Sequence, residues 1–428
     1  MNKKNKLTAL ERGWILYDVG NSAFILMVTT LVPIFFNALA SSAGVHEDLY
    51  LSYWGYAGSI CTILVAVIGP VCGAIADRNN KRRIFTLCLL IGSLCCAMLG
   101  GMRDWTTFLA MFILAKVGFS SSLVFYDSML PEITTAERMD KISSLGYAYG
   151  YIGSVIPFVV CLVLVLLHDS IGLAQSDAMA ISFAIIAIWW IICSVPLLKT
   201  YTQTAYQPAT EAPVKDAFRQ LYGTLKAARQ EKHIFLYLLS FFFFIDGVYT
   251  IIDMATAYGT ALGLDSTGLL LALLVTQIVA FPCAVVFGRL SVKHDTGLLI
   301  KVCILAYTCI TVFGIFLVSQ WQFWLLAVLV GMFQGGIQAL SRSYLGKIIP
   351  PDRSGEFFGL MDIFGKGASF VGLLLVSLVS QIFAGTTVEV FGLRLQNENL
   401  AVGSLIVLFV IGYVLFCKAD KLNKERTA

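Results

Sequence analysis

The fold of this chain is decided by the stretch Gly73-Ala-Ile-Ala-Asp77-Arg78-Asn-Asn80-Lys81-Arg82-Arg83. Long apolar runs lie on both sides of it, and each is long enough to cross the hydrocarbon core of a bilayer, which takes roughly 20 helical residues. We therefore predict a short loop between two membrane helices. Its four Lys and Arg residues indicate the cytoplasmic face. On charge alone it would be an ordinary positive loop, and only the order of its residues makes it more specific.

The composition is that of an integral membrane protein. Of the 428 residues, 58% are hydrophobic and 13% are charged, whereas soluble proteins carry about 25% charged residues. The net charge of +4 reflects sidedness and gives no indication of nucleic-acid binding. The 11 cysteines lie mostly inside apolar runs, without the paired spacing of a zinc site. We therefore predict no metal and no cofactor.

Twelve apolar runs are long enough to span a bilayer. With both termini in the cytoplasm, 26 of the 30 Lys and Arg residues fall on the cytoplasmic side, and a miscounted helix would scramble this asymmetry. The sequence therefore predicts an all-α, multi-pass protein in the plasma (inner) membrane. The expected helices cover residues 14–39, 50–76, 84–101, 105–125, 142–167, 178–198, 234–258, 268–290, 297–319, 321–340, 357–383 and 400–417.

The longest polar stretch, 199–232, divides the chain into six helices and six. We predict an N-terminal bundle (1–198), a cytoplasmic linker whose second part can form an amphipathic surface helix, and a C-terminal bundle (233–428). Faint repeats support two pseudo-symmetric bundles. Asp18 and Asp246 each precede polar residues three and four positions on, and Gly288 echoes Gly73. Val292 stands where Asp77 would be, so any second cytoplasmic lock must be weaker or differently made.

The order Gly-x-x-x-Asp-Arg followed by basic residues resembles the loop between helices 2 and 3 of the major facilitator superfamily of transporters. The resemblance implies that Gly73, Asp77, Arg78 and Arg83 act in a cytoplasmic gate, where the Asp and Arg help to hold the outward-open state. Asn80 departs from the usual Gly, but Asn tolerates a left-handed turn better than most residues.

Longer stretches resemble one branch of that superfamily, the autophagy-related vacuolar amino acid effluxers and their bacterial relatives. Departures at Val19-Gly20 and Tyr249 flank the expected cavity, so the resemblance does not fix the substrate. It implies a proton- or gradient-driven transporter of small solutes, with amino acids as one candidate class, whose helices 1, 4, 7 and 10 line the cavity. The stretches are 14–23, 125–132, 145–153, 338–343 and 356–360 with Gly365-Lys366, and the implied contacts are Asp18, Asn21, Lys116, Asp246, Gln334 and Gln338.

Ionisable residues inside the expected helices suggest further roles, because an insertion cost of about 2.5–3.5 kcal/mol keeps such groups away from lipid. Asp246 and Asp253 lie two turns apart on nearly one face, and we expect one or both to couple transport to protons or to bind a cationic group. Asp253 is equally compatible with a wetted position near the outer surface. Lys116 has no acid one turn away and needs either a distant partner or a substrate anion.

Two further features have structural interpretations. Asp362 and Lys366 are four residues apart and are expected to form an ion pair along their helix, ahead of any substrate contact. Gln334 and Gln338 either join helices or contact substrate.

We therefore expect a non-enzymatic, monomeric secondary transporter that moves a small polar solute, with protons, across the lipid bilayer by alternating access. A membrane sensor without net transport is the alternative. An intramembrane aspartyl protease is disfavoured, because Leu262-Gly-Leu-Asp265 fails the required Gly-x-Gly-Asp pattern.

Overall fold

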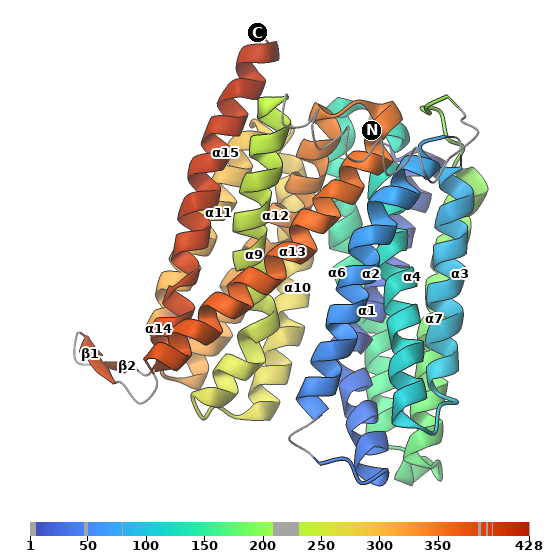
Figure 1. The fold of residues 1–428 in the computed structure, drawn as a ribbon, viewed down its shortest axis with the longest axis vertical. Helices are drawn as coiled ribbons and strands as arrows, with labels where there is room; N and C mark the ends of the chain where they lie inside the picture. Colours follow the sequence, from blue (N-terminus) through green and yellow to red (C-terminus); the bar gives the residue numbers. More distant parts are fainter. Residues whose placement is uncertain are drawn as a thin grey trace. The chain divides into compact units, whose positions relative to one another are not determined.

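The computed structural model describes residues 6–46, 50–78, 80–208, 231–383, 387–390, 393–395 and 397–427. Residues 209–230 lie outside this set, and with them most of the linker and its expected amphipathic helix. The boundaries drawn at 198 and 233 therefore remain predictions. In the described part, the helices that we expected are present and long (Figure 1).

Among the described residues, six helices of spanning length precede the linker. They are α1 (Ala9–Ser42), α2 (Tyr50–Ala76), α3 (Lys81–Leu99), α4 (Trp105–Ser128), α6 (Ala136–Leu166) and α7 (Gln175–Thr200), with short α5 (Leu130–Ile133) and the 3-10 turn η3 (Asp169–Ile171) between them. Within this half α1 packs on α7, while α3 packs on α4 and α7.

Six more follow it. They are α9 (Lys232–Ala261), α10 (Ser266–Leu290), α11 (Thr296–Ile315), α12 (Gln320–Ile348), α13 (Ser354–Ile382) and α15 (Leu405–Thr427), together with the 3-10 turn η4 (Pro351–Arg353) and α14 (Asn397–Gly403). The last expected helix is thus broken at Ser404 and runs ten residues further than its apolar stretch. Here α15 packs on α9 and α10 packs on α12.

The connection between α13 and α14 contains a feature that the sequence did not predict. Strands β1 (Val388–Val390) and β2 (Leu393–Leu395) pair antiparallel, with Glu389 opposite Arg394.

Local chemistry explains where many helices begin. Thr8 and Glu11 form a reciprocal capping box at the start of α1, and Asp104, Asp265 and Asp295 accept backbone N–H groups at the starts of α4, α10 and α11. At the end of α1, Gly44 adopts a φ of 75°, a conformation that costs glycine little. Each of the side chains at the helix starts satisfies N–H groups that the helix itself leaves unpaired.

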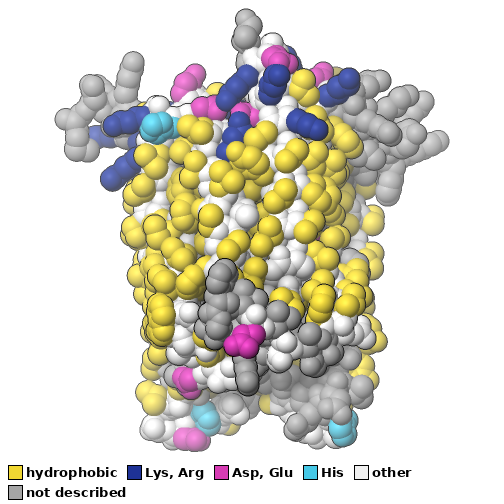
Figure 2. Space-filling model, turned by 90° about the vertical axis from the view of Figure 1, so that its left-hand side faces the viewer, with side chains coloured by type: hydrophobic (Ala, Val, Ile, Leu, Met, Phe, Trp, Pro, Cys, Tyr) yellow, Lys and Arg dark blue, Asp and Glu magenta, His cyan; other side chains and the backbone are white. Residues whose placement is uncertain are grey.

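The helices are apolar enough to be solvated by lipid. Among the described residues, eleven helices carry an apolar window of spanning length, and a shorter apolar segment, Val371–Ile382, belongs to α13. On the face drawn in Figure 2, hydrophobic side chains cover a broad middle band, while Lys and Arg side chains gather at one end. This confirms a multi-pass membrane protein whose described spanning segments are all helices.

The contacts divide the chain into two compact units that do not follow the chain order strictly. Unit 1 comprises Met1–Thr135, Tyr149–Leu221 and Pro350–Gly359, and unit 2 comprises Ala136–Ala148, Tyr222–Ile349 and Leu360–Ala428. Thus the start of α6 belongs with the second unit and the start of α13 with the first.

Candidate functional site

The glycine at the end of α2 is explained by a close approach of two backbones in unit 1. A Cβ on Gly73 would lie 2.5 Å from the carbonyl oxygen of Gly355, and a Cβ on Gly355 would lie 2.8 Å from the carbonyl oxygen of Gly73. Only a residue without a side chain permits this packing at either position. The end of α2 and the start of α13 therefore touch through paired glycines.

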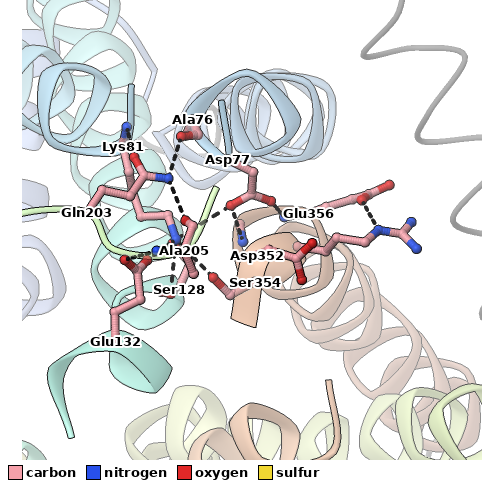
Figure 3. A network of polar contacts seen from close by, with 12 residues as sticks. Ala76, Asp77, Lys81, Ser128, Glu132, Gln203, Ala205, Asp352, Ser354 and Glu356 are labelled. Atoms are coloured by element: carbon pink, nitrogen blue, oxygen red, sulfur yellow. Dashed lines mark hydrogen bonds and ion pairs between the residues drawn. The ribbon is translucent and has the colours of Figure 1, made fainter. Parts of the chain in front are cut away.

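Asp77 uses this proximity to cap α13. Its two carboxylate oxygens accept the backbone N–H groups of Gly355 at 2.9 Å and Glu356 at 3.0 Å, the second and third residues of that helix. The carboxylate thereby satisfies two unpaired donors and meets the positive end of the helix dipole. Figure 3 shows the side chain directed at the start of α13.

Lys81 is the buried cation beside this carboxylate. Its Nζ lies 2.7 Å from Glu132 Oε1 and 3.5 Å from Asp77 Oδ1, and it donates to Ser354 Oγ at 2.9 Å. Burial raises the pKa of the Asp77 carboxyl above its ordinary value, against the opposing effects of Lys81 and of the two N–H donors. We call Asp77, Lys81 and Glu132 with the start of α13 the Asp77 network.

The chain just beyond α7 lies against the same network. Glu132 Oε1 also accepts Tyr201 Oη at 3.1 Å, and its Oε2 accepts the backbone N–H of Thr204 at 2.7 Å. The side chain of Gln203 bonds Ala76 O and the N–H of Lys81, both at 3.1 Å (Figure 3). Burial raises the pKa of Tyr201 far above its ordinary value, so its hydroxyl remains a donor.

The four expected gate residues are thus placed differently. Gly73 and Asp77 make the contacts with α13 described above, and Arg78 is half-buried beside them. Arg83 is exposed on α3, and within the described part of the chain no hydrogen bond or ion pair joins it to the Asp77 network. The sequence did not identify Lys81, Glu132 and Gln203 as members of this network. The available signals were the four-residue spacing from Asp77 to Lys81 and the acid in Leu130-Pro131-Glu132.

Unit 2 contains a counterpart in which the acid comes from a different element. Val292, in the position of Asp77, is 70% exposed. The acid is instead Asp140, at the start of α6, which accepts 2.6 Å bonds from Thr296 Oγ1, Ser343 Oγ and Lys347 Nζ. The polar cluster of unit 2, which we call the Asp140 cluster, is therefore built around an acid of α6 and not of the loop. A second lock at this place stays a prediction.

The glycine of the repeat keeps its packing role in that counterpart. A Cβ on Gly288 would lie 2.8 Å from Ser144 Cβ, so α10 approaches α6 closely. Ser143 lies one turn after Asp140 on α6. Arg342 donates to Ser143 Oγ and Ser143 O, both at 2.9 Å, and lies 4.3 Å from the centre of the Tyr147 ring. The start of α6 is thereby bound into unit 2.

Asp246 is the most deeply buried acid among the expected substrate contacts. It is 0% exposed on α9, and its Oδ1 accepts the backbone N–H of Gly372 at 3.0 Å and Thr250 Oγ1 at 3.3 Å. Its Oδ2 has no hydrogen-bond partner in the described part of the chain. Asp253, two turns further on, is exposed. The structure therefore gives the two acids of α9 different surroundings.

The glutamines of α12 also differ. Gln334 is buried, and its Oε1 is without a hydrogen-bond partner among the residues that the structure describes. Gln338, one turn on, is half-buried.

The expected contacts in unit 1 lie on α1 and α4. Asn21 donates to Tyr17 O at 3.0 Å and to Asp18 Oδ1 at 3.3 Å, so Asp18 and Asn21 form one buried polar pair. Lys116 is half-buried, with Nζ 5.8 Å from the centre of the Phe112 ring. No acid pairs with it within the described ranges.

The expected ion pair on α13 is not tested, because the side chain of Lys366 lies outside those described; Asp362 is half-buried. The described residues contain no cluster of His, Cys, Asp or Glu that could hold a metal ion.

Comparisons with known proteins show the family and the fold. A family model described as "Vacuole effluxer Atg22 like" matches residues 8–428. The chain is 39% identical over 416 residues to the uncharacterised MFS-type transporter YxiO of Bacillus subtilis, covering 96% of this chain and 94% of that one. It is 26% identical to autophagy-related protein 22-2 of Aspergillus clavatus over 56% of this chain, and the match spans only 43% of the fungal protein.

Solved structures share the fold at low identity. The human organic anion transporter MFSD10 superposes with a TM-score of 0.70 at 14% identity, over 97% of this chain and all of that one. The MFS transporter FucP in its outward conformation gives 0.70 at 13% identity, over 96% of this chain and 97% of that one. The chain is thus a multi-pass transporter and not an enzyme, and it belongs to the Atg22-like family of the major facilitator superfamily.

Proposed function

We propose that the protein is a proton-coupled secondary transporter of small polar solutes, and that Asp246 is its coupling site. The observation that carries this proposal is the burial of Asp246 with one carboxylate oxygen unpartnered and no ion pair among the described residues. A carboxylate in such a place is costly unless it is neutralised, and a proton is the smallest neutralising group.

The surroundings of Asp246 provide a route from protonation to movement. Its Oδ1 binds the backbone of α13 at Gly372, and a side chain at Gly372 would collide with Asp246 and Thr250. A change of charge on Asp246 therefore acts directly on the packing of α9 against α13. Two structural neighbours are titled proton symporters, for xylose and for fucose, which supports the same coupling ion.

Amino acids are the substrate class that we propose first. The family model describes a vacuole effluxer, and Lys116 offers a half-buried cation to a substrate carboxylate. Asp18 and Asn21 offer a buried polar pair that suits an ammonium group. Gln334 and Gln338 complete the set of proposed substrate contacts, and Asp253 is a second proposed proton-coupling residue.

We propose further that the Asp77 network is a cytoplasmic gate, with Gly73 and Arg78 in it. We also propose, from the excess of Lys and Arg at this end of the helices, that this end and both termini face the cytoplasm. The proposed location is the plasma membrane, and the proposed state is a monomer. Opening the gate then requires the carboxylate of Asp77 to leave the start of α13.

Flux measurements in sealed proteoliposomes test the function. A thermal-shift screen against amino acids, peptides, sugars and nucleosides first identifies a ligand, whose accumulation is then followed under an imposed pH gradient. We expect Asp246→Asn to lose proton-driven accumulation while retaining solute exchange. The matched control is Asp169→Asn, whose side chain is 92% exposed and which should behave like the wild type.

Two results would contradict the proposal. Wild-type accumulation by Asp246→Asn would exclude Asp246 as the coupling site. A ligand that stabilises the protein but is never transported, by wild type or variant, would favour a membrane sensor.

A further inference from the structure

Residues 201–207, which directly follow α7, bind both sides of the loop that carries Asp77. We call them the strap. They lie in unit 1 with the rest of the Asp77 network, and Gln203 is buried although it belongs to a polar connecting segment. A buried glutamine needs partners for its amide, and here the partners identify what the strap does.

The amide of Gln203 joins the two helices that flank the loop. Its Nε2 donates to Ala76 O, in the last residue of α2, and its Oε1 accepts the N–H of Lys81, the first residue of α3. Both are backbone groups that a helix end leaves without an internal partner. One side chain therefore fixes the separation of the two ends between which Asp77 is held.

Glu132 connects the strap to the buried cation. One oxygen binds Lys81, and the other accepts the backbone N–H groups of Thr204 at 2.7 Å and Ala205 at 3.2 Å. The carboxylate that neutralises Lys81 is thus held in place by the strap. Lys81 in turn donates to Ser354, the first residue of α13.

Gln207, at the far end of the strap, contacts Asp77 and the turn that precedes α13. The backbone N–H of Gln207 donates to Asp77 O at 2.7 Å, and its side chain donates to Asp352, in the turn that precedes α13. The strap consequently touches the end of α2 and the start of α3 through Gln203 (Figure 3). It touches the segment leading into α13 through Gln207.

We propose that Gln203 is a positioning residue of the gate, through which the beginning of the central linker holds Asp77 and Lys81 in the geometry that caps α13. Among the described residues Gln203 makes no hydrogen bond to α13, so its effect there passes through Asp77 and Lys81. The inference relies on the gate assigned above only for its meaning in transport, because the capping geometry can be measured without transport.

Hydrogen exchange of the full-length protein in lipid nanodiscs tests this inference. The variants are Gln203→Leu, which removes all hydrogen bonds of the side-chain amide, and Gln203→Glu, which keeps the acceptor for Lys81 but loses the donor to Ala76 and Ala205. Gln175→Leu, at an exposed glutamine, is the matched control. Peptides covering 353–358 report the Gly355 and Glu356 amides, and peptides covering 76–83 report the loop.

Loss of positioning should accelerate exchange of the Gly355 and Glu356 amides about tenfold in Gln203→Leu, with a smaller increase in Gln203→Glu and none in the control. Acceleration confined to 76–83 and 201–207 would overturn the proposal, because Gln203 would then be a local cap only. If Gln203→Leu does not fold, Gln203→Glu decides by the same criterion. A failure of the gate itself would instead appear as unimpaired flux in a variant whose α13 cap is broken.

Discussion

Replacing Gly73 by alanine tests whether the contact between α2 and α13 must form during transport. The new Cβ would lie 2.5 Å from the carbonyl oxygen of Gly355 and 2.9 Å from its carbonyl carbon. Real Cβ atoms essentially never approach closer than 3.0 Å, and both obstructing atoms are backbone. The two helices must therefore move apart by about 0.5 Å or more.

This separation falls on the bonds of Asp77, which are 2.9 and 3.0 Å long. An added 0.5 Å takes them beyond the range of about 2.7–3.2 Å in which N–H···O bonds are effective. Hydrogen bonds to a charged group contribute about 1.5–3 kcal/mol each, so a partial loss of both weakens the closed gate by about 2–4 kcal/mol. That corresponds to roughly a 30- to 1,000-fold change in the closed-to-open ratio.

The assay is solute flux into proteoliposomes, combined with exchange of the Gly355 and Glu356 amides. Gly58→Ala is the matched control, because it lies on the same helix and its Cβ would meet nothing within 4 Å. We expect Gly73→Ala to remain folded, to lose most transport and to expose the two amides, while Gly58→Ala resembles the wild type. Equal flux and equal protection in the two variants would refute a role of this contact in gating.

Three further predictions concern the rest of the molecule. Asp140→Asn should lower the free energy of unfolding of unit 2 by about 1–3 kcal/mol, because Lys347 loses its charged partner while remaining partly hydrated. The measurement is the melting temperature, and an unchanged value would show that the hydrogen bonds of Asp140 contribute little to stability. Gly372→Ala should abolish proton-driven accumulation but retain solute exchange, as in Asp246→Asn. The nearby Gly365→Ala, whose Cβ meets only ordinary contacts, should accumulate solute like the wild type. Equal accumulation by both variants would show that the contact of Asp246 with α13 has no part in coupling. Lys116→Gln should raise KM for amino acids about tenfold or more and leave neutral cargo unaffected, and an unchanged KM would remove Lys116 from the site.

Much of the fold was predictable because lipid imposes strict demands on a sequence. Every backbone group in the hydrocarbon must be bonded internally, so long apolar runs become helices, and most of their expected ends agree with the structure within a few residues. The hairpin Val388–Val390 with Leu393–Leu395 and the break at Ser404 escaped prediction. Both lie in the final connection and last helix, where apolar content no longer distinguishes the possible conformations.

The site was predictable only in part. Asp77 could be selected from the order of residues in its loop, but Lys81 was counted simply as one more positive charge. Its burial depends on Glu132, 51 residues away, and on Ser354, 273 residues away. Likewise, Val292 in the position of Asp77 indicated that the second half lacks this acid, but it did not indicate that Asp140 of α6 is the acid of the corresponding cluster. Such roles are set by which segments meet, and spacing along one helix does not contain that information.

By itself, the sequence determined that this chain crosses a membrane as a bundle of helices and which charged loop carries its signature. Tertiary structure alone decided that a buried lysine, a glutamate and a glutamine from the linker support that signature, and that Asp246 binds the backbone of α13. The physical reason is that hydrophobicity acts locally on each helix, whereas a charge can be buried without a large free-energy cost only where distant segments supply its partners.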